Sequence, residues 1–201
     1  MADRVPDLYL CSQSPRRREL LSQMEVTYLL LDVEIDETPI HEESPQEYVA
    51  RLAKEKAFKG WQCSSRLLNI PVLGADTTVV CNGEIMGKPL NEAQGLHMLT
   101  LQSGSLMQVF SAICLVNGKT LVQEMSQSSV LFRPLSSKEI KAYWSSGEPV
   151  DKAGGWAIQG KGAIFIKKLE GSYSGVMGLP IYETGECLKR FGIDCISGWT
   201  P

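Results

Sequence analysis

The start of the chain decides the fold, with residues 8–21 spelling LYLCSQSPRRRELL. The apolar run from Leu8 to Cys11 predicts a short buried strand. Ser14 followed by Pro15 is typical of a helix N-cap and a first helical residue, so a helix should begin there. The order is therefore a strand, a tight loop and a helix.

Strand and helix signals alternate along the rest of the chain. Residues 44–47, SPQE, form a capping box with proline at the first helical position, and they predict a helix that runs to Gly60. Asn-Gly pairs at 82–83 and 117–118 predict two hairpin turns. The other predicted elements are strands at 72–80, 84–86, 106–116, 120–132 and 163–168, and helices at 92–101, 136–144 and 180–191. Because hairpins are mixed with crossovers, we expect a mixed sheet flanked by helices, in an α/β or α+β fold and not an all-parallel barrel.

The composition is that of a globular protein. The chain has 201 residues, 43% hydrophobic and 21% charged, which suits a single domain over 1–201, or two lobes around one cleft. A net charge of −3 argues against broad nucleic-acid binding but not against a local basic patch. The longest uncharged stretch, 99–117, is too polar to span a membrane, and no apolar signal region precedes Cys11. We expect a cytoplasmic protein without membrane or nucleic-acid partners. Separately, the aromatic residue Trp199 suggests that the C-terminal end of the chain packs on the fold.

Cysteine and histidine usage limits the chemistry. The six cysteines form no C-x-x-C pair, and the only histidines are His41 and His97. A structural zinc site and a Ser-His-Asp relay are therefore excluded as leading hypotheses. The chemistry must use carboxylates, lysines, arginines and hydroxyls.

A cluster of arginines follows the first strand. Arg16, Arg17 and Arg18 fall in the first turn of the predicted helix, where positive side chains oppose the helix dipole unless an anion is bound. Together with the hydroxyls of Ser12 and Ser14 and the free helix amides, they predict a polyphosphate site. The alternative is a solvated basic face.

An aspartate interrupts an apolar strand in Gly74-Ala75-Asp76-Thr77. A buried carboxylate needs a partner, and a divalent cation or a water that it deprotonates would supply one, while Gly74 would allow close approach. The alternative is a bulge or strand end that leaves Asp76 exposed.

Two lysines are ambiguous. Lys56 lies on the same helical stripe as Val49, Leu52 and Ala53, so it points where the apolar side chains point. It is either a functional cation or a lysine whose stem lies on the core while its ammonium reaches water. Lys88, just after a hairpin strand, has the same ambiguity.

The acidic run Glu34-Ile35-Asp36-Glu37 offers oxygen ligands that suit Mg²⁺ or Mn²⁺. If the run is extended, Glu34 and Asp36 lie on one side and Glu37 on the other. A solvated acidic loop is the alternative, and the carboxylates become relevant to a site only if they face Asp76.

Residues 155–162, GWAIQGKG, match the glycine and lysine spacing of a P-loop. The match fails at Gly162, where a P-loop needs Ser or Thr, and an apolar β-like run follows instead of a helix. We interpret the segment as a turn between strands, with Gln159 offering an amide to a ligand.

These motifs together resemble the Maf family of nucleoside triphosphate pyrophosphatases. The resemblance rests on residues 12–17, 74–77, 87–89, 151–155 with 158–160, and 178–180, which are in family order over nearly the whole chain. It implies an elongated mixed α/β fold similar to that of inosine triphosphatases, with two lobes around a cleft that binds a nucleotide and Mg²⁺ or Mn²⁺. It also implies a cytoplasmic homodimer that splits a nucleoside triphosphate into monophosphate and pyrophosphate, some members being linked to arrest of septum formation.

The resemblance also assigns roles. Asp76 matches the proposed general base, and Glu37 matches the acidic residue near the metal and the catalytic water, so both are expected metal ligands. The expected polar and basic pocket comprises Ser12, Arg16, Arg17, Lys56 and Lys88.

A subgroup that acts on dTTP and UTP is similar to this chain at Arg16, Thr77 and Gln159, whereas the subgroup preferring 7-methyl-GTP has an aromatic residue in place of the arginine. Gln13 departs from the small residue usual in the family. The resemblance thus implies hydrolysis of dTTP, UTP and modified pyrimidine nucleotides.

Two hypotheses from other classes stay open. A regulatory protein of septum formation could use the same pocket to sense a nucleotide without turnover. A protein that binds nucleic-acid ends through its arginines should lose affinity steeply with salt.

Overall fold

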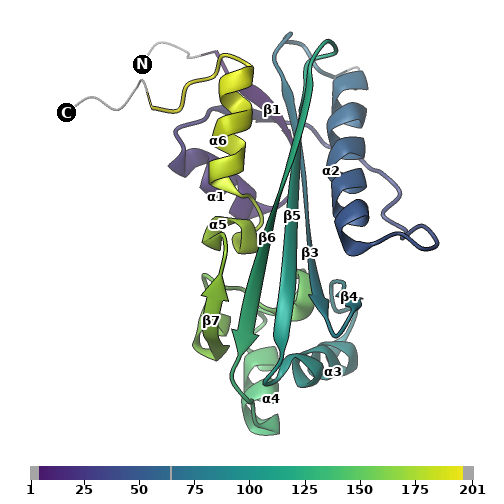
Figure 1. The fold of residues 1–201 in the computed structure, drawn as a ribbon, viewed down its shortest axis with the longest axis vertical. Helices are drawn as coiled ribbons and strands as arrows, with labels where there is room; N and C mark the ends of the chain where they lie inside the picture. The colour runs from purple at the N-terminus through teal and green to yellow at the C-terminus, as the bar shows by residue number, and fades with distance from the viewer. Residues whose placement is uncertain (1–4, 64, 197–201) are drawn as a thin grey trace. The chain divides into compact units, whose positions relative to one another are not determined.

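The protein is described here by a computed structural model that covers residues 5–63 and 65–196. Within that range it contains a seven-stranded sheet flanked by helices (Figure 1). The strand order is β2-β1-β3-β5-β6-β7, with β4 beside β3. Strand β1 pairs in parallel with β2 and β3, whereas β3–β4 and β6–β7 are antiparallel. The predicted mixed α/β fold is therefore confirmed.

The strands are β1 Leu8–Cys11, β2 Tyr28–Leu30, β3 Val72–Cys81, β4 Glu84–Met86, β5 Leu106–Val116, β6 Leu121–Phe132 and β7 Ile166–Glu170. The α-helices are α1 Pro15–Gln23, α2 Pro45–Gln62, α3 Glu92–Gln102, α4 Ser137–Ser145, α5 Tyr173–Met177 and α6 Ile181–Arg190, and short 3₁₀ helices cover η1 Ala153–Gly155 and η2 Lys161–Phe165.

The chain divides into two compact units. Unit 1 holds the residues up to 76, residues 111–126 and the residues from 178 onward, and unit 2 holds 77–110 and 127–177. Strands β3, β5 and β6 are each divided between the two units, with one part in unit 1 and the other part in unit 2. The single domain over 1–201 and the cleft between two lobes stay predictions. The predicted packing of Trp199 concerns a residue outside the described ranges.

In unit 1, helix α2 packs against strand β1 of the sheet, and Figure 1 shows it running along the sheet beside β3. Its predicted capping box is present, since Ser44 Oγ accepts from the Glu47 amide at 3.2 Å while the Glu47 carboxylate accepts from the Ser44 amide at 2.9 Å. A Cβ at Gly74 would lie 2.2 Å from the carbonyl oxygen of Ala53, so the strand and helix backbones almost touch. A Cβ at Gly60 would lie 2.1 Å from Cys11 Sγ. Two glycines therefore fix the height of α2 above the sheet.

In unit 2, an aromatic cluster supports the sheet. The ring of Phe132 on β6 lies 5.2 Å from that of Trp156, and Phe165 lies 5.0 Å from Tyr143, centroid to centroid. The predicted capping box at the start of α4 is also present, between Ser136 and Glu139. The cluster joins the segments around α4 and η2.

Two local predictions need correction, and two short elements were not predicted. The strand predicted at 163–168 begins only at Ile166, because a 3₁₀ turn covers 161–165 and the Ala163 amide donates to the Gly160 carbonyl at 3.1 Å. The segment 155–162 consequently leads into η2 and is not a turn between two strands. Strand β2 and helix α5 lack a sequence signal because each spans one short segment of three to five residues. No helix in the described part of the chain is long and apolar enough to cross a membrane.

Candidate active site

The first part of the site lies where β1 leads into α1. Ser14 occupies the N-cap with an extended backbone, and its side chain makes no capping hydrogen bond. The backbone amide of Ser14 donates to Ser12 Oγ at 3.2 Å. The amides of the first helical turn therefore have no side-chain cap from Ser14 and suit an incoming anion.

Arg17 is buried behind this turn and is bound to the chain itself. Its Nε donates to the carbonyl oxygen of Gly178 at 2.8 Å, and its Nη1 donates to Ser12 Oγ at 3.0 Å. Arg18 turns back to the carbonyl oxygen of Gln13 at 3.2 Å. The arginines therefore do not all point to one place: Arg17 fixes Ser12 and the segment at Gly178, and Arg16 stays half-buried.

Burial lowers the pKa of Arg17, an effect that the charges of Asp76 and Glu37 oppose and that of Arg16 reinforces. Burial also lowers the pKa of Arg16. Arg17 is therefore within electrostatic reach of Arg16, Asp76 and Glu37. An anion bound beside the arginines would offset their desolvation.

Asp76 is the second part of the site. It lies inside β3 and is only 9% exposed, so the alternative of an exposed strand end is wrong. Its Oδ1 accepts from Lys56 Nζ at 2.7 Å. The parallel register pairs Cys11 with Gly74, so Ser12, directly after β1, and Asp76, two residues beyond Gly74 on β3, both lie just past that pair.

Lys56 joins Asp76 to the acidic loop. Its Nζ lies 2.7 Å from Asp76 Oδ1 and 2.7 Å from Glu37 Oε1. The lysine side chain is 13% exposed and that of Glu37 is 53% exposed, so the ammonium is buried between a core carboxylate and a surface one. The alternative of a lysine reaching freely into water is therefore wrong. Removing either carboxylate would leave a buried charge with one partner fewer.

The members of the acidic run 34–37 do different things. Asp36 Oδ1 accepts from the Thr38 amide at 2.9 Å, and hydrogen bonding with the side chain and then the backbone of Thr38 lowers the pKa of Asp36. Glu34 lines a surface pocket together with Asp32 and Lys59. Glu37 pairs with Lys56, so it is the residue of this run that the structure connects to Asp76.

The donor set suits a hard divalent cation. Two carboxylates lie within hydrogen-bond distance of one nitrogen, and oxygen ligands are those that Mg²⁺ and Mn²⁺ prefer. Among the described residues, no group of three or more His, Cys, Asp or Glu is arranged to hold a metal ion. Mg²⁺ commonly takes one or two protein carboxylates and completes its shell with water and substrate phosphates. Asp76 and Glu37 fit that pattern.

The remaining predicted residues lie in unit 2. Thr77 is half-buried and follows Asp76 in β3, whereas Lys88 after β4 and Gln159 before η2 are exposed. The structure thus groups Ser12, Arg16, Arg17, Glu37, Lys56 and Asp76 in unit 1 and leaves Thr77, Lys88 and Gln159 in unit 2.

Sequence reasoning missed the residues that hold the loop of Gln159. Glu148 accepts from the amides of Lys161 at 2.8 Å and Gly162 at 2.9 Å, and from the hydroxyl of Tyr143 at 2.8 Å. Burial acts to raise the pKa of Glu148, but these hydrogen bonds outweigh it and the pKa is lowered. A carboxylate that caps a loop thirteen residues away has no local sequence signal.

A family model described as "Maf-like protein" matches residues 7–191. The chain belongs to the Maf-like protein family. It is 46% identical over 198 residues to the dTTP/UTP pyrophosphatase of Alkalilimnicola ehrlichii, covering 96% of this chain and 97% of that relative. Proteins named dTTP/UTP pyrophosphatase from Pseudoalteromonas atlantica and Saccharophagus degradans are 46% and 43% identical, and cover 92% and 99% of this chain and 97% and 95% of their own lengths.

Among solved structures, the Ham1 protein of Staphylococcus aureus is similar at 12% identity, covering 65% of this chain and 72% of that one, with a TM-score of 0.39. A score that low supports no argument, so the family assignment rests on the sequence matches.

Proposed function

We propose that this protein hydrolyses dTTP, UTP and modified pyrimidine nucleotides to the monophosphate and pyrophosphate. The observation that carries the proposal is the buried pair of Lys56 and Asp76, shared with Glu37 and coupled to Arg17 beside the uncapped start of α1. It combines an anion site with a carboxylate base, which are the two parts that phosphoryl-transfer chemistry needs. The names of the curated relatives agree with this substrate class.

The proposed binding mode uses unit 1 for the triphosphate. The first-turn amides of α1, the hydroxyl of Ser12 and the guanidinium of Arg16 bind phosphate oxygens, while Arg17 holds Ser12 in place through its 3.0 Å hydrogen bond. Lys88, an exposed cation of unit 2, is proposed as a further phosphate contact.

Asp76 is the proposed general base. Lys56 binds Oδ1 and fixes the orientation of the carboxylate, so we assign proton acceptance to Oδ2. Asp76 would take the proton from the water that attacks the α-phosphorus, and pyrophosphate would leave. Asp76 and Glu37 would also hold Mg²⁺ or Mn²⁺, whose charge would offset that of the phosphates.

The pyrimidine preference is proposed to depend on Arg16, Thr77 and Gln159. An amide such as that of Gln159 can pair with the polar edge of uracil or thymine, and a site built for such hydrogen bonds rejects bases that leave it unpaired. We further propose a cytoplasmic homodimer without nucleic-acid or membrane partners.

The experiment is pyrophosphate release from dTTP, UTP, CTP, GTP and 7-methyl-GTP, with Mg²⁺, with Mn²⁺ and with a chelator. We expect metal-dependent turnover of dTTP and UTP above the others. Tight binding of these nucleotides without turnover would overturn the proposal in favour of a nucleotide sensor.

A further inference from the structure

Glu37 lies on a segment with no helix or strand of its own. Residues 31–44 connect β2 to α2, and most of their side chains are exposed. The Glu37 side chain is 53% exposed, and an ion pair gives little stability to a carboxylate that must be ordered in water. The 2.7 Å contact of Glu37 with Lys56 therefore needs a backbone that is already held in place.

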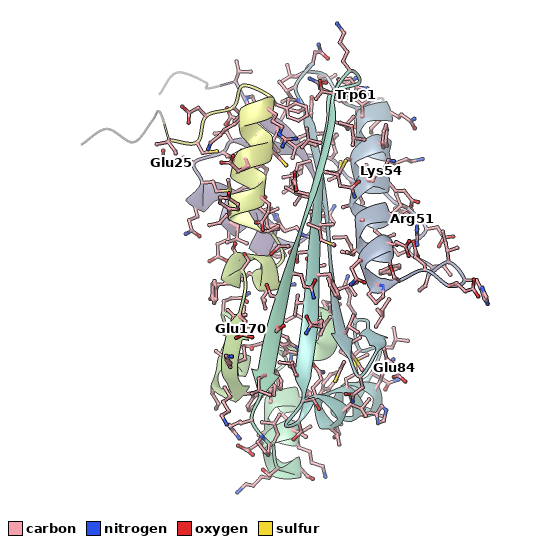
Figure 2. The ribbon with its side chains drawn as sticks, viewed as in Figure 1. Glu25, Arg51, Lys54, Trp61, Glu84 and Glu170 are labelled. Carbon is pink, nitrogen blue, oxygen red and sulfur yellow. The ribbon has the colours of Figure 1, made fainter. Side chains whose placement is uncertain are left out.

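Helix α2 holds that backbone at two successive carbonyl groups. The hydroxyl of Tyr48 donates to the Glu37 carbonyl oxygen at 2.9 Å, and Nη2 of Arg51 donates to that of Thr38 at 3.1 Å. Residues three apart lie on the same face of a helix, so both donors come from one side of α2. Figure 2 shows Arg51 on the side of α2 nearest this loop.

Arg51 is itself fixed by a carboxylate of the loop. Its Nε lies 2.6 Å from Glu43 Oε1 and its Nη2 lies 2.8 Å from Glu43 Oε2, a two-point pairing that only a guanidinium provides. Glu43 Oε2 also accepts from the Ile40 amide at 3.1 Å. The hydrogen bonding between Arg51 and Glu43 raises the pKa of the arginine and lowers that of the glutamate.

Tyr48 belongs to the same arrangement. The Arg51 guanidinium lies 5.6 Å from the centre of its ring. Burial raises the pKa of Tyr48, and the negative charges of Asp76 and Glu37 raise it further, so the phenol stays protonated and able to donate. Tyr48 therefore lies within electrostatic reach of both carboxylates of the candidate site.

We propose that Tyr48 and Arg51 are positioning residues. They fix the position of the Glu37 carboxylate by binding the backbone of residues 37 and 38 to α2, the helix that carries Lys56. They act through Glu37 and do not touch the reacting atoms. Because α2 supplies Lys56, Tyr48 and Arg51, one rigid element fixes the distance between the loop carboxylate and Asp76. This inference rests on the proposed function, since it assigns Glu37 a part in turnover.

The test uses Tyr48→Phe, which removes the hydroxyl but keeps the ring beside Arg51. We expect kcat for dTTP to fall about tenfold, the size typical of residues that orient a metal ligand, while KM changes little. Arg51→Lys keeps the charge but not the two-point pairing, and should act in the same direction. The matched control is Tyr182→Phe on α6, where the tyrosine is 75% exposed, and it should leave kcat unchanged.

Two measurements separate positioning from general damage. In a Glu37→Gln background, Tyr48→Phe should cause no further loss, because residues acting through one group are not additive. Hydrogen exchange should show faster exchange of the amides of residues 33–43 in Tyr48→Phe than in the wild-type protein, with the urea midpoint unchanged.

The outcomes are distinguishable. A wild-type protein that releases no pyrophosphate overturns the proposed function and this inference with it. An active wild-type protein in which Tyr48→Phe loses nothing, or loses as much beside Glu37→Gln as alone, overturns the inference and leaves the proposed function standing. Unchanged hydrogen exchange in residues 33–43 would also overturn it.

Discussion

Asp76 and Gln159 are held in place in opposite ways. Asp76 lies inside a strand, where the sheet pairing, the glycine at 74 and the ammonium of Lys56 fix it. Gln159 is exposed and follows the buried residues 156–158, and the backbone around it is held by side chains: Glu148 accepts from the amides of residues 161 and 162, and the Tyr143 hydroxyl accepts from that of residue 157. The first position is set by the sheet and the second by a few side-chain hydrogen bonds to a loop.

This difference teaches which features of the protein tolerate change. A charged group inside a strand depends on many neighbours, since every element packed on it must leave room for it and its partner. A loop residue depends on a few hydrogen bonds, so its setting can change without altering the rest of the fold. In the proposed function, Asp76 carries out the reaction from the rigid position. In the same proposal, Gln159 selects the nucleobase from the adjustable one.

The largest expected effect comes from changing Asp76, the rigidly held residue. Asp76→Asn keeps an oxygen that can accept from Lys56 but removes the base, so turnover should fall by roughly 10²- to 10⁴-fold. Binding of a non-hydrolysable dTTP analogue should stay close to that of the wild-type protein. Single-turnover kinetics and calorimetric titration measure the two quantities.

The control for this variant is Asp194→Asn, which changes an exposed aspartate after α6. It should leave both quantities unchanged. Near-normal turnover by Asp76→Asn would remove Asp76 from the role of base.

A smaller effect tests whether the glycine sets the position of Asp76. In Gly74→Ala the new methyl group would lie 2.2 Å from the Ala53 carbonyl oxygen and 2.5 Å from the Ala57 nitrogen. Backbone atoms cannot turn aside as a flexible side chain can, so we expect destabilisation of about 1–3 kcal/mol by urea unfolding, together with lower turnover.

Gly185→Ala in α6 is the matched control. Among the described residues its methyl group would meet only Met24 Cε, at 3.8 Å, and alanine favours a helix over glycine by up to about 1 kcal/mol. The control should therefore be neutral or stabilising. Equal unfolding free energies for Gly74→Ala and the wild-type protein would show that α2 can move away from β3 without cost.

Most of the fold could be predicted from the sequence where the signal was local. The capping box at Ser44 and the turns at 82–83 and 117–118 depend on residues next to one another, and they were predicted correctly. Strand β2 is a three-residue edge with no alternation, so its pairing with β1 is set only by the tertiary fold.

The same limit applies to the site. Asp76 was detectable because a carboxylate interrupts an apolar strand, and Lys56 because it shares an apolar helical stripe. Residue spacing alone did not show which acid of the 34–37 run faces Lys56, since that depends on a loop held by Tyr48 and Arg51, and only the resemblance to the Maf family singled out Glu37. The distant capping by Glu148 escaped for the same reason, and with it the 3₁₀ turn at 161–165.

The smallest expected effect concerns the loop of Gln159, the more adjustable of the two positions. In Glu148→Gln the side chain offers one accepting oxygen in place of two, so the Lys161 amide, the Gly162 amide and the Tyr143 hydroxyl compete for it. We expect a loss of about 1 kcal/mol in unfolding free energy and a weaker preference for dTTP over dGTP. Urea unfolding and the ratio of kcat/KM values measure these effects.

The pH dependence sharpens this prediction. The pKa of Glu148 is lowered in the folded protein from an ordinary value of 4.5, so its stabilisation is fully present above that pH and is lost as the pH falls through the folded pKa. The stability difference between the wild-type protein and Glu148→Gln should therefore be constant from neutral pH to about pH 5 and should shrink below pH 4.5. The control is Glu84→Gln, which changes the exposed first residue of β4 in the same unit and should leave the free energy of unfolding unchanged (Figure 2). A Glu148→Gln difference that persists undiminished in acid would mean that the loop of Gln159 is held by shape alone and not by the carboxylate charge.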